Sequence, residues 1–130
     1  MHAMVLAAPG APLRFELRQD PVPGAGDVRV MVSACAVCRT DLHVVDGELL
    51  GIAYPIVPGH EVVGRIDALG PGVTARRIGE RVGSDGTEFF KIAAQADIKT
   101  HTTAFPLQQA NEVLAKLCAG QITGAAVLQP

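Results

Sequence analysis

The sequence has few aromatic residues and no excess of basic charge. It contains no tryptophan, one tyrosine and four phenylalanines among 130 residues, whereas nineteen residues are alanine. A buried core must therefore be built mainly from Val, Ile, Leu and Ala. The 11 Lys and Arg residues are balanced by 13 Asp and Glu residues, for a net charge of −2. Such a chain has no positive field that attracts phosphate backbones, so nucleic acid is not an expected partner.

Long apolar runs and a cysteine framework are also missing. No unbroken apolar stretch approaches the length of a membrane-spanning helix, and residues 1–15 lack the cationic start and apolar stretch of a secretion signal. We therefore expect no membrane partner and a cytoplasmic location. The three cysteines are few and odd in number, which favours reduced thiols or metal ligands over a disulfide framework.

Glycine and proline are frequent, with fourteen and nine residues, and eleven and seven of these lie in the first 83 positions. This composition is typical of many short strands in one domain rather than of a helical bundle. Apolar residues that alternate with polar ones predict strands over 13–17 and 28–35. A short apolar run predicts a strand over 4–7, and segments bounded by Gly residues predict further strands over 56–58, 61–69 and 81–82.

The pattern changes after Ser84. Asp85 and Glu88 have the spacing of a capping box, which predicts a helix over 86–96. An extended segment over 99–105 follows, and Pro106 then begins a second helix that ends at Gly120. A last strand is expected over 124–128. The predicted fold class is mainly β (α+β), with two flanking helices from the C-terminal segment.

Candidate metal ligands cluster in the stretch Cys35-Ala-Val-Cys38-Arg-Thr-Asp41-Leu-His43 and in Gly-His60-Glu61. Thiolate, imidazole and carboxylate groups are the ligands that zinc prefers. Each motif alone has a simpler interpretation, because two cysteines in an apolar strand are often buried thiols. A histidine after glycine is often only a turn residue, and neighbouring strand residues face opposite ways.

Together these segments resemble the zinc-dependent medium-chain alcohol dehydrogenases. The resemblance rests on ACAVCRTDLH and GHEVVGRIDALG, on their order and spacing, and on the PIVP that precedes the second motif. It covers segment 1–83, which is similar to the family's N-terminal catalytic segment, and segment 84–130, which is similar to its C-terminal one. In the family both segments form a single catalytic domain with a GroES-like β-barrel fold, so we expect residues 1–130 to form one such domain.

The resemblance implies a role for each site residue. Cys38 and His60 are the zinc ligands, and Glu61 is the acid that approaches or replaces the zinc-bound water. Asp41 is the carboxylate that orients the zinc histidine. Thr40 and His43 form the relay that carries the alcohol proton to solvent. Cys35 is a bystander in this family, and Cys118 matches no ligand position.

Two parts of the family are missing between the segments: the structural zinc lobe and the nucleotide-binding domain. No G-x-G-x-x-G motif follows any predicted strand, so NAD is not expected to bind and the chain alone is not expected to act as a dehydrogenase. The family's third zinc ligand is lost with the same region, which leaves Glu61 or Asp41 as a third ligand. The join near Gly83, at a strand end, is typical of a deletion made by design.

The expected function is therefore that of an isolated catalytic domain that binds zinc and small alcohols or carbonyl compounds without redox turnover. One alternative is a metal-free GroES-like structural or interaction module, and another is a weak zinc hydrolase. Because the former interdomain surface is exposed, we also expect self-association through it.

Overall fold

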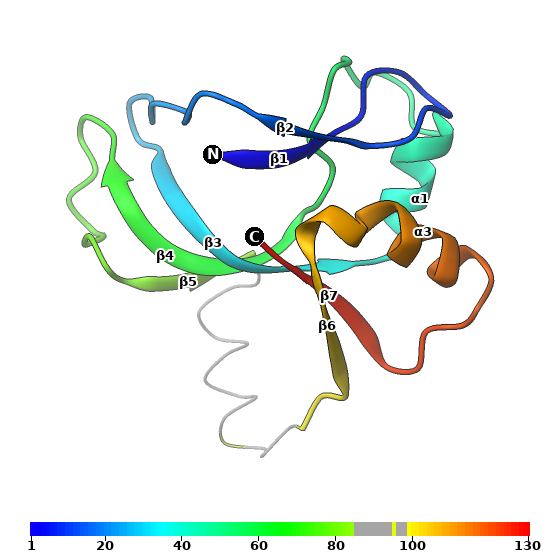
Figure 1. Ribbon diagram of the computed structural model, residues 1–130. Coiled ribbons are helices and arrows are strands. Elements are labelled where there is room, and N and C mark those ends of the chain that lie inside the picture. Colours follow the sequence, from blue (N-terminus) through cyan, green and yellow to red (C-terminus); the bar gives the residue numbers. More distant parts are fainter. Residues whose placement is uncertain (85–94, 96–98) are drawn as a thin grey trace.

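Strands dominate the structure, a computed structural model that describes residues 1–84, 95 and 99–130. In this part of the chain β1 and β2 form an antiparallel pair that lies across a curved five-stranded sheet of order β5-β4-β3-β7-β6 (Figure 1). None of the described helices is long and apolar enough to cross a membrane. The elements are β1 (His2–Val5), β2 (Arg14–Leu17), β3 (Val28–Val37), α1 (Arg39–Asp46), β4 (Glu61–Leu69), β5 (Arg81–Gly83), β6 (Thr102–Pro106), the 3-10 helix η1 (Leu107–Gln109), α3 (Ala110–Cys118) and β7 (Ala125–Gln129).

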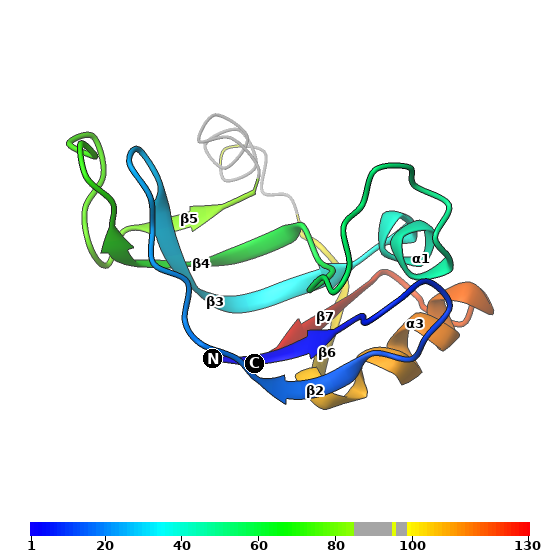
Figure 2. The same ribbon diagram turned by 90° about the horizontal axis from the view of Figure 1, so that it is seen from above.

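The longest strand, β3, is the centre of the larger sheet. It pairs with β4 along most of its length and with β7 at residues 35–37. The β3–β4 register shifts between Arg29 and Val30 and again before Ala34, and such bulges bend and twist a sheet. Gly64 of β4 makes this close approach feasible, since a Cβ atom there would lie 2.2 Å from the Met31 carbonyl oxygen. The larger sheet therefore curves below the β1–β2 pair in the view of Figure 1, and the view from above shows this pair on the side of α3, away from β5 (Figure 2).

The C-terminal strand β7 lies between β3 and β6. It runs antiparallel to β3, with Cys35 opposite Leu128, and parallel to β6. Residues 35–37 and 126–128, about 90 positions apart in the sequence, thus share hydrogen bonds in one sheet.

The core is small and aliphatic, as the shortage of aromatic residues predicts. Leu6 and Val113 are completely buried, and Tyr54 and Phe105 are only partly buried at its border. Asp41 is the one charged side chain that is buried among the described residues. The core cluster consists of Met4, Leu6 and Leu13 near the N-terminus, Ala110, Val113 and Leu114 of α3, and Ala126 and Leu128 of β7.

The predicted fold class is confirmed, and most predicted strands are present. The expected strand over 56–58 was wrong, because only an isolated bridge joins Ile56 to Leu6. The predicted helix over 86–96 lies outside the described residues, Gln95 apart. The second predicted helix is present as η1 and α3, although Pro106 belongs to β6. Helix α1 was not predicted, so one of the two described α-helices comes from the segment before residue 84.

A chain that ends at Gly83 is expected to lose cooperative folding. It lacks the core side chains of α3 and β7, and it exposes the apolar faces of β1 and β3 that they cover. Urea unfolding followed by circular dichroism measures this, with the full chain as the control. A single cooperative transition in the shorter chain would contradict the prediction.

Candidate functional site

Helix α1 begins directly after β3, and its first turn fixes a carboxylate. Cys38 is the N-cap residue, with the extended backbone angles φ −127° and ψ −179°. Its backbone N–H donates a 2.9 Å hydrogen bond to Oδ2 of Asp41, three residues later. Asp41 is only 4% exposed, so the start of this helix holds a buried carboxylate next to the Cys38 thiol.

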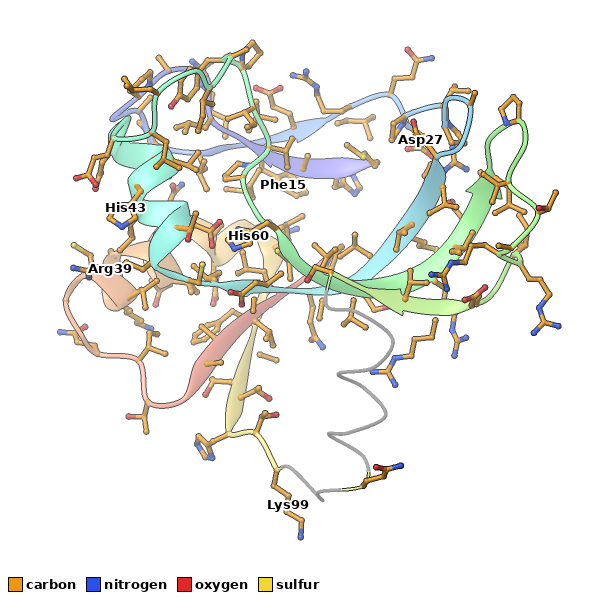
Figure 3. All side chains as sticks on the ribbon, turned by 180° about the vertical axis from the view of Figure 1, so that it is seen from behind. Phe15, Asp27, Arg39, His43, His60 and Lys99 are labelled. Atoms are coloured by element: carbon orange, nitrogen blue, oxygen red, sulfur yellow. The ribbon has the colours of Figure 1, made fainter. Side chains whose placement is uncertain are left out.

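His60 reaches the same place from the start of the neighbouring strand, β4. The β3–β4 pairing sets Ala36 opposite Glu61, so the residue before β4 lies beside the end of β3. Gly59 has φ +117° there, and a Cβ atom on it would lie 2.8 Å from Sγ of Cys35. Glycine therefore allows the turn that brings the His60 ring against α1, the helix that carries His43 (Figure 3).

The two ring nitrogens of His60 lie near different groups. Its Nε2 lies 3.6 Å from Sγ of Cys38 and 3.8 Å from Oε1 of Glu61. Its Nδ1 lies 3.6 Å from Oδ1 of Asp41. The imidazole therefore separates a thiol and an exposed carboxylate on one side from a buried carboxylate on the other.

These donor atoms suit a zinc ion. Ligand atoms of Cys38, Asp41 and His60 all lie within 4.8 Å of one another. Two ligands at Zn–S and Zn–N distances of about 2.3 and 2.0 Å in a tetrahedral shell are roughly 3.5 Å apart, close to the distance that joins Cys38 to His60. Oδ1 of Asp41 is buried without a hydrogen-bond partner, and a histidine held by a metal would donate Nδ1–H to it. The residues present therefore fit the metal.

Thr40 and His43 lie three residues apart on α1, a spacing that places side chains on one helix face. The described contacts of the His43 ring are with Glu48, whose Oε2 is close to Nδ1. Helix α1 ends at Gly47 in the left-handed conformation (φ +76°), and the Glu48 N–H then donates to the His43 carbonyl at 2.9 Å. This helix end brings Glu48 over His43. Sequence reasoning missed Glu48, although the Asp-Gly pair before it is a helix-stop signal.

The other two cysteines lie apart from this cluster. Cys35 donates a weak hydrogen bond to the Ala36 carbonyl, and burial together with the nearby charges of Asp41 and Glu61 raises the pKa of its thiol to about 11. Cys118 is exposed at the end of α3. Of the three thiols, Cys38 alone belongs to the group of converging ligand atoms among the described residues.

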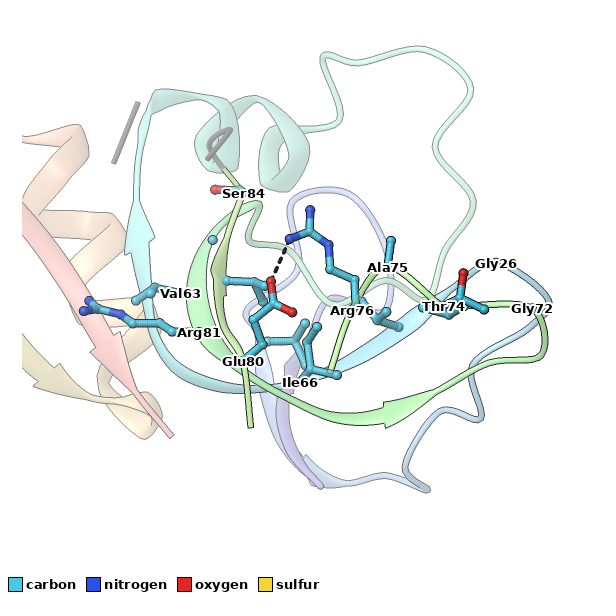
Figure 4. Close-up of a pocket in the computed structure, with 15 residues that line it drawn as sticks. Gly26, Val63, Ile66, Gly72, Thr74, Ala75, Arg76, Glu80, Arg81 and Ser84 are labelled. Atoms are coloured by element: carbon cyan, nitrogen blue, oxygen red, sulfur yellow. Dashed lines mark hydrogen bonds and ion pairs between the residues drawn. The ribbon is translucent and has the colours of Figure 1, made fainter. Parts of the chain in front are cut away.

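Two cavities open beside the sheets. One, of about 580 Å³, lies between the β1–β2 pair and the larger sheet, and its lining includes Met4, Val32, Leu114, Cys35 and Asp41. The other, of about 860 Å³, lies against β3, β4 and β5, where Arg76 and Glu80 form a 2.7 Å ion pair (Figure 4). The first cavity is mainly apolar and shares Asp41 with the candidate site, whereas the residues that line the second include no predicted site residue.

Comparison with known proteins gives consistent matches. The family model described as the alcohol dehydrogenase GroES-like domain matches residues 24–120. The chain is 46% identical to an alcohol dehydrogenase of Moraxella sp. over 84 residues. This matched region covers 64% of this chain and 25% of that protein. It is similar to the structure of a short chain alcohol dehydrogenase of E. coli complexed with NADH, with a TM-score of 0.56 and 41% identity over 64% of this chain and 23% of that one. It is also similar to zinc dependent alcohol dehydrogenase 2 of Streptococcus pneumonia, with a TM-score of 0.59 and 28% identity over 64% of this chain and 24% of that one. The chain thus spans about a quarter of the length of these relatives.

Alkylation is expected to separate the thiols. Because iodoacetamide reacts with the thiolate, a pKa of about 11 makes Cys35 a poor nucleophile at pH 8. We expect Cys35 to react at least about tenfold more slowly than the exposed Cys118, as measured by mass spectrometry of timed digests. The difference should vanish in guanidinium chloride. Equal rates in the folded protein would contradict the burial of the Cys35 thiol.

Proposed function

Because this chain belongs to the family of alcohol dehydrogenase GroES-like domains, we propose that it is the zinc- and alcohol-binding part of a zinc-dependent alcohol dehydrogenase. The observation that carries this proposal is the 3.6 Å contact between the Cys38 thiol and Nε2 of His60, with the buried Asp41 behind the ring. Small primary or secondary alcohols and the corresponding carbonyl compounds are the proposed ligands. A reducing compartment such as the cytoplasm suits the three free cysteines.

Cys38 and His60 would hold the zinc ion, and Glu61 is the proposed third ligand. Glu61 faces the same ring nitrogen as Cys38, whereas Asp41 faces the other nitrogen. A bound zinc ion withdraws electron density from the oxygen of a coordinated alcohol and lowers the pKa of its hydroxyl. Glu61 is half exposed, with 48% of its side chain accessible, so it would be the displaceable member of this ligand set.

Asp41 is proposed to position His60. A buried carboxylate that accepts Nδ1–H keeps the proton on that nitrogen and leaves the Nε2 lone pair free for the metal. Its second oxygen is already held by the Cys38 N–H at 2.9 Å, so the carboxylate cannot rotate freely. The same residue therefore orients both the thiol-bearing turn and the imidazole.

Thr40 and His43 are proposed to move the alcohol proton. The Thr40 hydroxyl accepts the proton of the alcohol and passes its own proton to Nε2 of His43, which releases it to solvent. Glu48 supports this direction, because its contact with Nδ1 of His43 keeps a proton there and leaves Nε2 as the acceptor. His43 is partly exposed and Glu48 is exposed, which suits exchange with water.

Zinc binding tests the proposal. The full chain is expected to bind one equivalent of zinc, and both Cys38→Ser and His60→Ala should weaken binding by at least about a hundredfold, since each removes one of the few strong ligands. Asp41→Asn should weaken it by roughly tenfold or more. Competition with a chromophoric chelator measures these affinities.

Cys118→Ser and His101→Ala are the matched controls, because they remove the same groups at exposed positions away from the cluster. Both should bind zinc like the original chain. If Cys38→Ser retains the original zinc affinity, or if the full chain binds no zinc, the proposed metal centre is wrong and a metal-free module is favoured.

The chain alone is proposed not to transfer hydride to NAD, because no nucleotide-binding domain separates its two segments and no G-x-G-x-x-G motif is present. We expect no enhancement of NADH fluorescence on titration with the protein and no NAD-linked oxidation of ethanol or benzyl alcohol. A full-length alcohol dehydrogenase is the positive control. Saturable NADH binding would contradict this prediction.

A further inference from the structure

The outer edge of β2 presents unpaired backbone groups. Among the described residues β2 has only β1 as a neighbouring strand. Met1 and Arg18 exchange two backbone hydrogen bonds of 2.8 Å, so they form a hydrogen-bonded pair of this antiparallel ladder. Along an antiparallel ladder, hydrogen-bonded pairs alternate with pairs that are not hydrogen-bonded. The N–H and C=O groups of Glu16 and Arg14, two and four residues from Arg18, therefore also point toward β1. The groups of Phe15 and Leu17 point away from it.

One end of this edge is already occupied. The Asn111 side-chain amide accepts from the Leu13 N–H and donates to the Leu13 carbonyl, both at 2.9 Å. These are the bonds that the peptide group of a neighbouring strand would make, and they confirm the alternation. The open part of the edge therefore begins at Phe15 and continues through Leu17.

The side chains along this edge alternate in charge. Strand alternation from β2 onward assigns Arg14, Glu16, Arg18 and Asp20 to one face, with signs plus, minus, plus and minus. In the single chain Arg18 contacts Glu16 at 3.0 Å and Asp20 contacts the N-terminal amino group at 2.6 Å, and both are exposed contacts that a second copy can share. Charges usually protect a strand edge from pairing with another chain. An alternating row is different, because it complements its own sequence when a second copy is placed antiparallel in the correct register.

Three two-fold symmetric antiparallel registers would bring the open backbone groups of two β2 strands together. Only one of them combines free backbone groups with pairs of opposite charge. Phe15 opposite Phe15 would set Leu17 against Leu13, whose groups Asn111 already holds. Glu16 opposite Glu16 would also set Arg14 against Arg18, so that all these pairs have like charges. Leu17 opposite Leu17, in contrast, sets Glu16 against Arg18 and Arg14 against Asp20.

We propose that β2 is a docking edge for a second copy of this chain, which adds its own β2 antiparallel with Leu17 opposite Leu17. The two copies then form four cross-strand pairs of opposite charge. The contact also covers Leu17, which is 77% exposed in the single chain. This interface uses none of the proposed zinc ligands, so it stands or falls independently of the proposed function.

Charge reversal tests both the edge and the register. Sedimentation velocity of the full chain over a concentration series is expected to show a reversible monomer–dimer equilibrium. Glu16→Arg and Arg18→Glu each create like-charge pairs across the two-fold axis, and each should weaken dimerisation by at least about tenfold.

Mixing the two variants is the sharper measurement. Position 16 of one variant then faces position 18 of the other, and every cross-strand pair again has opposite signs. The equimolar mixture is therefore expected to recover the dimer that neither variant forms alone. The matched control is Glu112→Arg, which makes the same charge change on the exposed side of α3 and should dimerise like the original chain.

Three results would overturn the proposal. The full chain could remain a monomer up to about 1 mM, which excludes useful self-association. Both charge variants could dimerise as well as the original chain, which assigns the contact to another surface. The mixture could fail to dimerise while each variant retains its circular dichroism spectrum, which excludes this register.

Discussion

The candidate site depends on the antiparallel register between β3 and β4. Ala36 faces Glu61 in this register, and the residues just beyond the ladder, Cys38 and His60, therefore meet although 22 positions separate them. A slip by one residue would turn the side chains of β4 to opposite faces and move Glu61 and His60 away from the thiol. The register is protected by the bulges of β3 and by Gly64, where the backbones approach too closely for any side chain.

Asp41 is the second constraint, and it is of a different kind. A carboxylate buried to 4% exposure is costly unless its oxygens are satisfied. One oxygen accepts the Cys38 N–H, and the other has no hydrogen-bond partner but lies 3.6 Å from His60. The fold thus keeps Oδ1 of Asp41, an acceptor without a hydrogen-bond partner, next to Nδ1 of the imidazole. A metal on the opposite nitrogen would complete this arrangement, because it would hold the ring with its N–H aimed at Asp41.

Prediction from sequence succeeded where a pattern is local. Alternation in 13–17 predicted β2, the segment 61–69 between glycines predicted β4, and the helical spacing after Pro106 predicted α3. Helix α1 was missed because it has only eight residues and its N-cap is Cys38, which is not a usual N-cap residue. The strand predicted around Ile56 is absent, since this apolar run between prolines makes only one isolated bridge, to Leu6. Glu48 was missed because its contact with His43 arises from the left-handed Gly47, not from a ligand-type motif.

The sequence by itself determined the kinds of residue available: an aliphatic core, a strand-rich body, and a thiol, an imidazole and carboxylates in a recognisable order. Only the tertiary structure decided which of these groups meet. It sets Cys38 and Glu61 against one nitrogen of His60 and Asp41 against the other, and it leaves Cys35 behind Gly59 with a raised pKa. It also decided which edge of β2 stays open. The physical reason is the same in each case, because strand register and backbone hydrogen bonds join residues that are distant in the sequence.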